Sequence, residues 1–573
     1  MSWKKRPFNQ ELENKFVSEK HDRLLSRLLS QRSSVVGNAR EFVTASYEGM
    51  TDPFLLPNME QAVSIFVDAV ENKKSISVIG DYDCDGVISS AMMMELCRAL
   101  NVECTVFLPD RMVHGYGFSQ QTLDAFKAKH KSPPSLLISL DCGSNNYDEV
   151  QALKEWGIEN VIIIDHHLMG DKKADNADAL VNWHLSDHQE MCTCGQLYQF
   201  IRGVYQRTNG AVNPIEFLTY AAFGTIGDSS PLVGNNRIIV RNGLSEFATS
   251  HVSSFGFSSL IAKAKVKAGE ILQEDVSFRI VPMINASGRM AKPDFAYHLL
   301  MENDSTTADL IAENLFDLNS ERKKLQRKIT KEAIEMVRAN EGGYKHGIML
   351  CRDDWHIGIV GIVASKIVEC FGKPAIVIGK HDGKYKGSGR TPPEINLKEI
   401  LDQIGDKLFT AYGGHAAAVG VSLKPEIMDS NKLSLANKLF NEECEKYCLN
   451  NSIEQVQQYY DLELKASSVN LDTARLIKNN LYPYSDINPE PVFKLSNAVV
   501  SDAQLKEGQG WSMLTFNASV DGIQIPFVFR QFNPEKKTDL GGGTHDLYFK
   551  LPQDTKGSGK GIDISLIDIE TNK

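Results

Sequence analysis

The sequence Ser75-Ile76-Ser77-Val78-Ile79-Gly80-Asp81-Tyr82-Asp83-Cys84-Asp85-Gly86 decides the fold, because a short apolar run ends in three closely spaced acids. Two further runs have the same form: Leu136–Leu140 leads into Asp141-Cys142-Gly143, and Val161–Ile164 leads into Asp165-His166-His167. Each run has the length and composition of a fully buried strand. Ligands of an open parallel sheet bind outside the carboxyl ends of its strands, so these acids and histidines are expected to meet in one small volume.

A divalent metal centre is the economical interpretation of this cluster. Carboxylates at such spacing repel or raise each other's pKa unless cations lie between them. Oxygen ligands with histidine suit Mn²⁺ or Mg²⁺ better than a thiolate-preferring metal, and two such ions ~3.5–4 Å apart can activate water for phosphoryl displacement. The alternative, in which the acids only cap helices and form turns, accounts for one such motif far better than for three at successive strand ends.

The pattern along the chain predicts an α/β protein of several domains. Strand and helix signals alternate from about residue 52, which implies a parallel sheet with right-handed crossovers. A long helical pattern from about Thr306 to Asn340 precedes a second, smaller α/β region with a Gly-rich tail, and strand-like runs beyond about Ile453 predict a small β-barrel or sandwich. We expect the long helix to join the two α/β domains around a cleft. The predicted parts are a helical lead-in, a catalytic α/β domain, a helical connector, a second α/β domain and a β domain: 1–50, 51–245, 246–342, 343–452 and 453–573.

The composition is that of a globular protein without a membrane or export signal. The chain has 573 residues, of which 42% are hydrophobic and 24% charged. Its net charge of −11 argues against an overall basic surface but allows a local basic groove. No apolar run approaches the ~20 residues of a membrane span, and no apolar segment of a signal peptide follows the N-terminus. Ten scattered cysteines are typical of reduced thiols, so we expect a cytoplasmic protein.

Four motifs give the sequence a family resemblance: Asp83-x-Asp85-Gly86, Asp141-Cys142-Gly143, Asp165-His166-His167 and Gly224-Thr225-Ile226-Gly227-Asp228. In this order they resemble the DHH phosphoesterase superfamily and, within it, the RecJ family of bacterial single-stranded-DNA exonucleases. Asn285–Met290 and Trp355–Ser365 match further segments, Gly387–Arg390 and Gly413–Gly420 resemble the DHHA1 partner domain, and Asn488–Phe493 resembles the start of the OB-fold domain. The likeness spans roughly residues 50–550.

The resemblance implies a ligand set for two Mn²⁺ or Mg²⁺ ions: Asp83, Asp85, Asp141, His166 and Asp228. Asp141 would bridge the ions, and Asp81 would lie in or behind this set together with Asp165. His167 would contact the scissile phosphate rather than a metal. The catalytic residues implied are therefore Asp141, His166 and His167.

The resemblance also implies a phosphate-binding site for the substrate, called the phosphate grip below. Arg111 matches a segment that holds a 5′ phosphate, and Ser388 and Arg390 match the partner-domain part of the same grip. The planar fork of an arginine suits phosphate oxygens. His415 lies between small residues that let backbone approach a phosphate, and a substrate contact is favoured for it over a structural role. Further substrate-binding candidates in the matching segments are Tyr116, Asn285, Arg289 and His356.

The reaction implied is hydrolysis of single-stranded DNA from its 5′ end to 5′ mononucleotides, in recombination and repair. Such an enzyme would need a helicase and a single-strand-binding protein as partners. Two alternatives remain: a phosphodiesterase for short oligoribonucleotides or cyclic dinucleotides, and a non-catalytic DNA-binding relative. The β domain argues against the first, and the complete ligand set argues against the second.

One other cluster has metal-ligand chemistry. His184, His188, Cys192 and Cys194 are close enough in sequence for a zinc site. Against it, Cys-x-Cys is not the usual spacing of a zinc knuckle, and the segment matches an ordinary connection into a helix. Whether these residues bind zinc is left open by the sequence.

Overall fold

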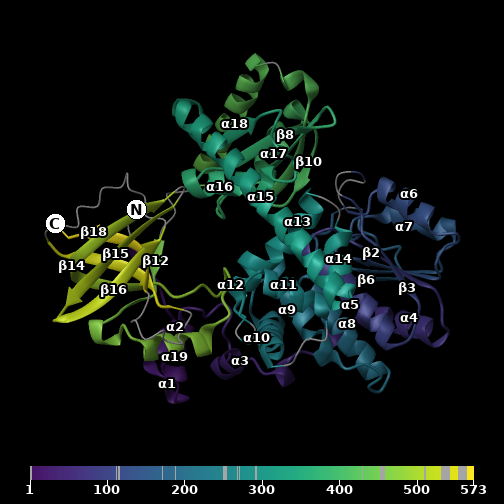
Figure 1. The fold of residues 1–573 in the computed structure, drawn as a ribbon, viewed down its shortest axis with the longest axis horizontal. Coiled ribbons are helices and arrows are strands. Elements are labelled where there is room, and N and C mark those ends of the chain that lie inside the picture. The colour runs from purple at the N-terminus through teal and green to yellow at the C-terminus, as the bar shows by residue number, and fades with distance from the viewer. Residues whose placement is uncertain are drawn as a thin grey trace. The chain divides into compact units, whose positions relative to one another are not determined.

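The computed structural model describes residues 3–110, 113, 117–170, 172–187, 189–249, 254–267, 269, 271–290, 293–428, 430–451, 458–508, 511–530, 543–552 and 564–572 (Figure 1). The chain divides into two compact units: the first holds residues 1–253, 266–281 and 456–573, and the second holds 254–265 and 282–455. The first unit therefore combines the lead-in, the first α/β region and the β domain. The five domain boundaries given above stay a prediction.

The first unit contains the predicted parallel sheet. Its strands are β2 (Ile76–Gly80), β3 (Cys104–Phe107), β4 (Leu136–Leu140), β5 (Asn160–Ile164) and β6 (Ala179–Val181), in the order β3-β2-β4-β5-β6 and all parallel. Strand β6 was not predicted, because its apolar run of three residues is shorter than a usual buried strand. The helices around the sheet are α4 (Met59–Glu71), α5 (Cys84–Ala99), α6 (Gln120–Lys129), α7 (Tyr147–Trp156), α8 (Thr193–Arg207) and α9 (Leu218–Gly227).

Both faces of this sheet are buried, which explains its continuous apolar strands. Ile79, Leu137 and Ile163 face α6 and α7 in one apolar cluster, and in Figure 1 these two helices lie on the opposite side of the sheet from α4 and α5. Every residue of β2 and β4 is buried. A strand covered on both sides cannot accept charge along its length, so its charged residues follow at the end.

The C-terminal part of the first unit is the predicted β-barrel. Strands β14 (Phe493–Gly508), β15 (Trp511–Val520), β16 (Ile523–Arg530), β18 (Ile564–Thr571) and β17 (His545–Lys550) pair in that order, and pairing of β14 with β17 closes the ring. The short strand β13 (Leu462–Glu463) pairs in parallel with the start of β14. Phe516 and Phe527 stack on each other and are buried in the barrel core.

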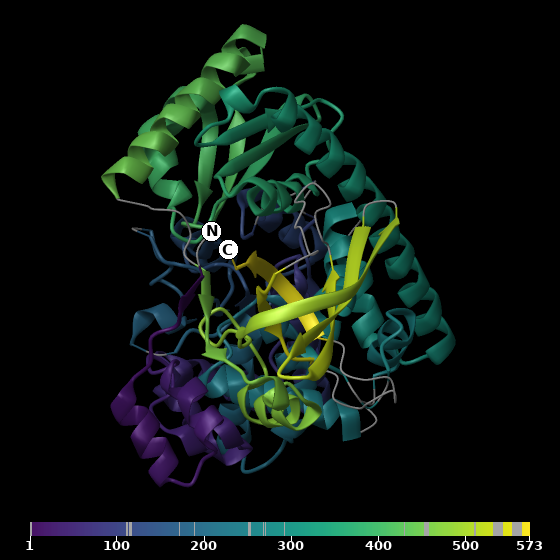
Figure 2. The ribbon, with the colours of Figure 1, turned by 90° about the vertical axis from the view of Figure 1, so that its left-hand side faces the viewer.

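The N-terminal helices α1 (Gln10–Ser18), α2 (Arg23–Ser30) and α3 (Ala39–Thr44) share an apolar core with the barrel and with α19 (Leu471–Leu481). In Figure 2 the purple N-terminal helices lie beside the pale green helix of the C-terminal part. Arg237 of α10 (Gly234–Thr249) strengthens this junction, because its buried guanidinium donates to five carbonyls, those of Phe42 and of 480–483. Burial lowers the pKa of Arg237 to about 9.

The second unit is built on a mixed sheet. Its strands are β7 (Ile348–Cys351), β8 (Ala375–His381), β9 (Lys384–Arg390), β10 (Phe409–Gly414) and β11 (Ala418–Leu423), in the order β10-β11-β9-β8-β7. Only β7 and β8 are parallel. Strands β9, β10 and β11 lie in the segment for which the sequence predicted only a Gly-rich tail. They were not predicted because glycines weaken the pattern of a strand. The helices of this unit are α11 (Phe255–Lys263), α13 (Val281–Met290), α14 (Asp294–Met301), α15 (Ser305–Ala339), α16 (Val360–Phe371), α17 (Leu397–Leu408) and α18 (Ser430–Asn450).

Candidate metal centre

The carboxyl ends of four neighbouring strands are level with one another. Gly80 pairs with Leu140, Leu140 with Ile164, and Ile164 with Val181. The next residue of each strand therefore stands at the same edge: Asp81, Asp141, Asp165 and Asn182. Their backbone positions are fixed by the ladder, because the amides of the three aspartates donate to the carbonyls of the neighbouring strand ends at 3.0–3.2 Å. The predicted meeting of acids at one edge of the sheet is present in the structure.

Asp83 and Asp85 belong to the turn that starts α5. Asp83 is the N-cap of α5, and its carboxylate accepts from the amides of Asp85 and Gly86 at 3.0 and 3.3 Å. Gly86 is required here, since a Cβ at this position would lie 2.5 Å from the carbonyl oxygen of Asp81. The same turn therefore brings the helix close to the strand end and directs two acids to one place.

Asp85 is buried, and it is held from a different helix. Its two carboxylate oxygens accept from the amides of Thr193 and Cys194, the first residues of α8, at 2.7 and 2.9 Å. The amides of a first helical turn have no partner within the helix, and they favour negative charge. These bonds fix the orientation of the Asp85 side chain.

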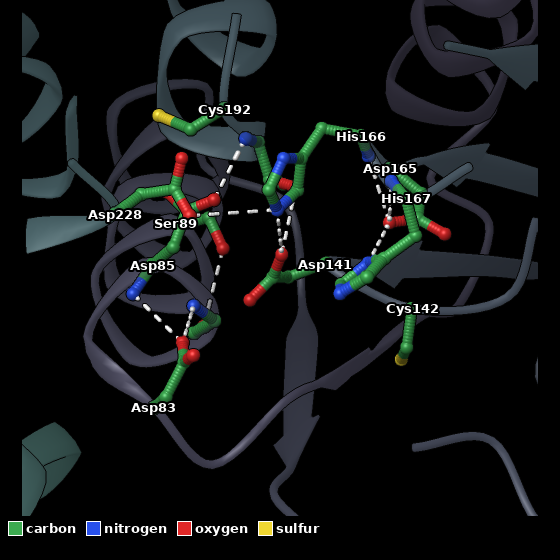
Figure 3. A network of polar contacts seen from close by, with 12 residues as sticks. Asp83, Asp85, Ser89, Asp141, Cys142, Asp165, His166, His167, Cys192 and Asp228 are labelled. Atoms are coloured by element: carbon green, nitrogen blue, oxygen red, sulfur yellow. Dashed lines mark hydrogen bonds and ion pairs between the residues drawn. The ribbon is translucent and has the colours of Figure 1, made fainter. Parts of the chain in front are cut away.

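Asp228 closes the cluster from α9, which ends at Gly227. Its carboxylate accepts from the Ser230 hydroxyl at 2.8 Å and lies 3.7 Å from Nε2 of His166. Close packing of α9 depends on glycine, since a Cβ at Gly227 would lie 2.7 Å from the Cys84 sulfur. Figure 3 shows Asp85, Asp141 and Asp228 gathered around His166.

Asp165 lies behind the cluster and orients the histidines. One of its oxygens accepts from the amide of His166 and from Nδ1 of His167, both at 2.7 Å, and the other accepts from the amide of Ser144 at 2.9 Å. Burial alone would raise the pKa of Asp165, but the hydrogen bond and the charge of His167 outweigh it and hold this pKa below its ordinary value. Asp165 is therefore an ionised support for His167.

Three overlapping groups of ligand atoms have the spacing of metal sites: Asp81, Asp83 and Asp141; Asp85, His166 and Asp228; Asp141, His166 and His167. Within each group the atoms lie within 4.8 Å of one another. Asp141 and His166 each belong to two groups, and Asp141 Oδ1 lies 3.3 Å from His166 Nε2. Asp141 also has a positive φ of 64°, an uncommon conformation that aspartate tolerates better than most residues.

The electrostatics of the cluster show that the residues fit divalent cations. Burial and the charges of Asp85 and Asp83 raise the pKa of Asp141 well above its ordinary value. Burial also raises the pKa of Asp228 to about 7, although His166 opposes the shift. Without a cation, these raised pKa values favour the protonated forms of Asp141 and Asp228. A hard cation in the cluster would replace those protons and remove the repulsion between oxygens.

The cluster of His184, His188, Cys192 and Cys194 does not form a group with metal-ligand spacing within the described residues. Cys192 is the N-cap of α8 and its sulfur accepts from the amide of Gly195, whereas the Cys194 sulfur donates to the carbonyl of Asp85. The ring of His184 packs on Trp183 with centroids 3.6 Å apart. His188 lies outside the described residues. The two cysteines instead support the carboxylate cluster.

The candidate phosphate grip divides between described and undescribed residues. Arg111 and Tyr116 lie outside the described residues. In the second unit, Ser388 and Arg390 are on β9 against the first turn of α16, since a Cβ at Gly361 would lie 3.3 Å from both side chains. His415 follows β10, where its amide donates to the carbonyl of Ala418, and Ala418 pairs with Arg390.

The other second-unit candidates lie at the loop that precedes α16. Arg289 donates to the carbonyl of Gly358 at 3.2 Å, and His356 Nδ1 accepts from the amide of Gly358 at 3.1 Å. Burial lowers the pKa of His356. Asn285 is on α13, one turn before Arg289. The second-unit candidates other than Asn285 therefore have contacts near the start of α16 or beside β9: Ser388, Arg390, His415, Arg289 and His356.

Several residues that hydrogen-bond to the carboxylate cluster were not predicted from the sequence. Asn182 donates from Nδ2 to the Ser144 hydroxyl and to the His167 carbonyl, both at 2.9 Å. Gln196 donates to the Asp165 carbonyl at 2.9 Å. Asn182 follows a short apolar run, which was the available signal; for Gln196 and Thr193 the sequence has none, since their roles depend on where α8 begins in space.

Two family models match the chain: the DHH family, N-terminal domain, over residues 75–225, and the DHHA1 domain over residues 343–446. Among curated proteins, the single-stranded-DNA-specific exonuclease RecJ of Salmonella typhimurium is 31% identical over 510 residues, which cover 84% of this chain and 86% of that protein. RecJ of Escherichia coli is 30% identical over 511 residues, with the same coverage of 84% and 86%. RecJ of Bacillus subtilis is 33% identical over 489 residues, and the match covers 84% of this chain but only 59% of that longer protein.

Solved structures agree with the fold. A crystal structure of RecJ from Thermus thermophilus in complex with Mn²⁺ has a TM-score of 0.79 at 22% identity, covering 100% of this chain and 79% of that one. A crystal structure of exonuclease RecJ bound to manganese has a TM-score of 0.59 at 27% identity, covering 68% of this chain and 95% of that one. Within the described part of the chain, no helix is long and apolar enough to cross a membrane. By the extent of its identity to the Salmonella and Escherichia proteins, the chain belongs to the RecJ family of single-stranded-DNA-specific exonucleases.

Proposed function

We propose that this chain is a metal-dependent exonuclease that hydrolyses single-stranded DNA from the 5′ end and releases 5′ mononucleotides, in DNA recombination and repair. The observation that carries this proposal is the convergence of strand ends, α5 and α9 on three overlapping groups of metal-ligand atoms. Membership of the RecJ family supports the substrate and its polarity, which the ligand cluster alone would leave open.

We assign two cations, Mn²⁺ or Mg²⁺, to the cluster. Asp81, Asp83 and Asp141 would hold one ion, and Asp85, His166 and Asp228 the other. Asp141 lies beside His166 and is the natural bridge between the two sets. When bound, such ions lower the pKa of the attacking water and stabilise charge on the phosphate.

His167 is our candidate for a direct contact with the scissile phosphate. Its Nδ1 is bound to Asp165, which orients the ring, and we assign the contact with the phosphate to Nε2. Burial lowers the pKa of His167, but the hydrogen bond and charge of Asp165 outweigh it and raise this pKa overall. A protonated His167 can donate from Nε2 to a phosphate oxygen while Asp165 keeps the ring in place.

The second unit would hold the substrate. Ser388 and Arg390 lie beside the first turn of α16 and combine a hydroxyl and a guanidinium fork with the positive end of a helix, all of which suit a phosphate. We also assign to the substrate Arg111 and Tyr116 of the first unit and Asn285, Arg289, His356 and His415 of the second. The proposal requires single-stranded DNA from a helicase and a single-strand-binding protein, and a location in the cytoplasm, where chromosomal DNA is accessible.

The test is digestion of a long 5′-phosphorylated single strand, labelled at either end, with Mn²⁺ or Mg²⁺. Wild-type protein is compared with Asp141→Asn, because asparagine also tolerates the positive φ at this position, and with Asp148→Asn, which changes an exposed aspartate paired with Lys172. Rapid release of the 5′ label as mononucleotide, lost in Asp141→Asn and kept in Asp148→Asn, is expected. Hydrolysis of short RNA or dinucleotides alone would move the chain to the small-substrate class, and inactivity on every phosphodiester would favour a binding protein.

A further inference from the structure

Thr193 lies where two parts of the carboxylate cluster meet, and the proposed chemistry gives it no role. It is the first residue of α8, and its side chain is completely buried. The helix start is held firmly on both sides of it. The sulfur of the N-cap residue Cys192 accepts from the amide of Gly195 at 3.5 Å, and Gln196 donates to the Asp165 carbonyl at 2.9 Å. The first turn of α8 is therefore a fixed reference beside the cluster.

Thr193 makes two hydrogen bonds to two different aspartates. Its amide donates to Oδ2 of Asp85 at 2.7 Å, and its hydroxyl donates to Oδ1 of Asp141 at 3.2 Å. The two bonds differ in kind, because the first comes from the backbone and the second from the side chain. A substitution of the side chain can therefore remove one bond and keep the other.

The two aspartates belong to different groups of ligand atoms. Asp85 forms a group with His166 and Asp228, whereas Asp141 forms one with Asp81 and Asp83. The two aspartates that Thr193 contacts come from different elements: Asp85 from α5, and Asp141 from the end of β4. Thr193 contacts one member of each set from a third element, so it fixes the position of one set relative to the other.

Thr193 is the first residue of α8, so its helix offers it no carbonyl one turn earlier, in contrast to Thr225 of α9, which donates to the carbonyl of Ala221. The Thr193 hydroxyl is directed to the carboxylate of Asp141 instead, and a hydrogen bond to this group is strengthened when a bound cation keeps the group ionised. Asp141 also has an uncommon backbone conformation, which needs support from its surroundings.

We propose that Thr193 is a positioning residue that sets the separation of the two cation sites through its hydroxyl. This inference rests on the proposed two-metal function. It goes beyond that function because it assigns the coupling between the sites to a residue that is itself no ligand. Supporting partners of metal ligands typically contribute about 10–100-fold in metal affinity.

The test is Mn²⁺ binding to the full chain, measured by calorimetry and by electron paramagnetic resonance. Thr193→Val keeps the shape and the backbone bond to Asp85 but removes the hydroxyl. We expect the second Mn²⁺ to bind about 10–100-fold more weakly, with loss of the spin coupling between the two ions at concentrations that saturate wild type. Thr219→Val is the matched control, since Thr219 is a buried threonine whose hydroxyl bonds to the carbonyl of Gly243 at 3.4 Å.

Thr193→Ser separates the hydroxyl from the packing of the methyl group. It is expected to bind both ions as wild type does, and a loss equal to that of the valine variant would overturn the proposal in favour of packing. Wild-type binding of two coupled ions by Thr193→Val would also overturn it. If wild type itself binds no Mn²⁺, the proposed two-metal function fails first, so the two failures are distinguishable.

Discussion

The parallel sheet of the first unit and the mixed sheet of the second unit present opposite chemistry at the ends of their strands. Three strands of the first sheet end level in aspartates: Asp81, Asp141 and Asp165. In the second sheet, the antiparallel strand β9 carries Ser388 and Arg390 toward the start of α16. The parallel sheet thus collects negative charge for cations, and the mixed sheet collects donors for an anion.

The difference follows from how strands are connected. In a parallel sheet every carboxyl end lies on the same edge, so a motif repeated at successive strand ends produces a dense cluster. In an antiparallel sheet neighbouring strands end at opposite edges, and a polar site must combine one strand with a helix start or a turn. A cluster of carboxylates is therefore natural in the first unit, and a spaced phosphate grip in the second.

The largest expected effect is a loss of nuclease rate when one carboxylate of the metal cluster is made neutral without a change in fold. Asp83→Asn keeps an oxygen for the two N-cap hydrogen bonds of α5, since asparagine caps helices about as well as aspartate. Loss of a cation ligand should lower the nuclease rate by about 10³-fold, because metal stabilisation is worth several kcal/mol and each 1.4 kcal/mol is about tenfold. Initial rates on 5′-phosphorylated single strands measure the effect.

Asp22→Asn is the control for this substitution. Asp22 caps α2 in the same unit through the amides of Leu24 and Leu25, but it belongs to none of the ligand groups found among the described residues. Its activity and melting temperature should match those of wild type. Equal rates for Asp83→Asn and Asp22→Asn would remove Asp83 from the metal site.

A smaller effect, on KM, is expected for the phosphate-binding candidate Arg390 of the second unit. Arg390→Lys keeps the charge but loses the planar fork, and a hydrogen bond to a charged group contributes about 1.5–3 kcal/mol. We expect KM for 5′-phosphorylated DNA to rise by about 10–100-fold, with kcat changed less. KM for 5′-hydroxyl DNA should change little.

Lys386→Ala tests whether charge alone matters on β9. Lys386 is exposed on the same strand, and its loss removes a full charge. If the fork of Arg390 is what recognises phosphate, Lys386→Ala will change KM less than Arg390→Lys does. The opposite order would indicate a general electrostatic field instead of a specific grip.

The glycines near the two sites give a third test, this time of stability. A Cβ at Gly86 would lie 2.5 Å from the Asp81 carbonyl oxygen, whereas a Cβ at Gly413 would meet nothing within 4 Å. Gly86→Ala should destabilise the first unit by about 1–3 kcal/mol through overpacking. Gly413→Ala should be neutral or slightly stabilising. Urea unfolding followed by circular dichroism compares them, and equal midpoints would show that the α5 turn can relax.

Much of the acidic edge could be predicted from the sequence, because each of its acids directly follows an apolar run or begins a helix. Asp81, Asp141 and Asp165 carry this local signal. Asn182 follows only the three-residue run of β6, which is a weak signal, and Thr193 has none, since its position depends on how α8 packs against α5. The strands β9, β10 and β11 were obscured by glycines, and the five carbonyl bonds of Arg237 join segments about 200 residues or more apart. Long-range packing of this kind has no local pattern.

The smallest expected effect is a change in local stability at the C-terminal ends of two helices that each connect a pair of parallel strands, one in each sheet. Helix α7 follows β4 and ends at Gly157 with φ of 115°, and α16 follows β7 and ends at Gly372 with φ of 64°. Asparagine tolerates the left-handed region near φ of 50–70° but not a φ far beyond it. Gly372→Asn should therefore cost less than about 0.5 kcal/mol and Gly157→Asn about 1 kcal/mol.

Hydrogen exchange along each helix measures this difference locally, which avoids the problem that a chain of two units need not unfold in one step. The last turn of α7 should exchange faster in Gly157→Asn, and that of α16 should be almost unchanged in Gly372→Asn. The space around the two residues points the same way, since a Cβ at Gly157 would lie 3.2 Å from Pro133 and one at Gly372 would meet nothing within 4 Å. Equal exchange in the two variants would mean that backbone conformation at the helix end does not distinguish the crossover helices of the two sheets.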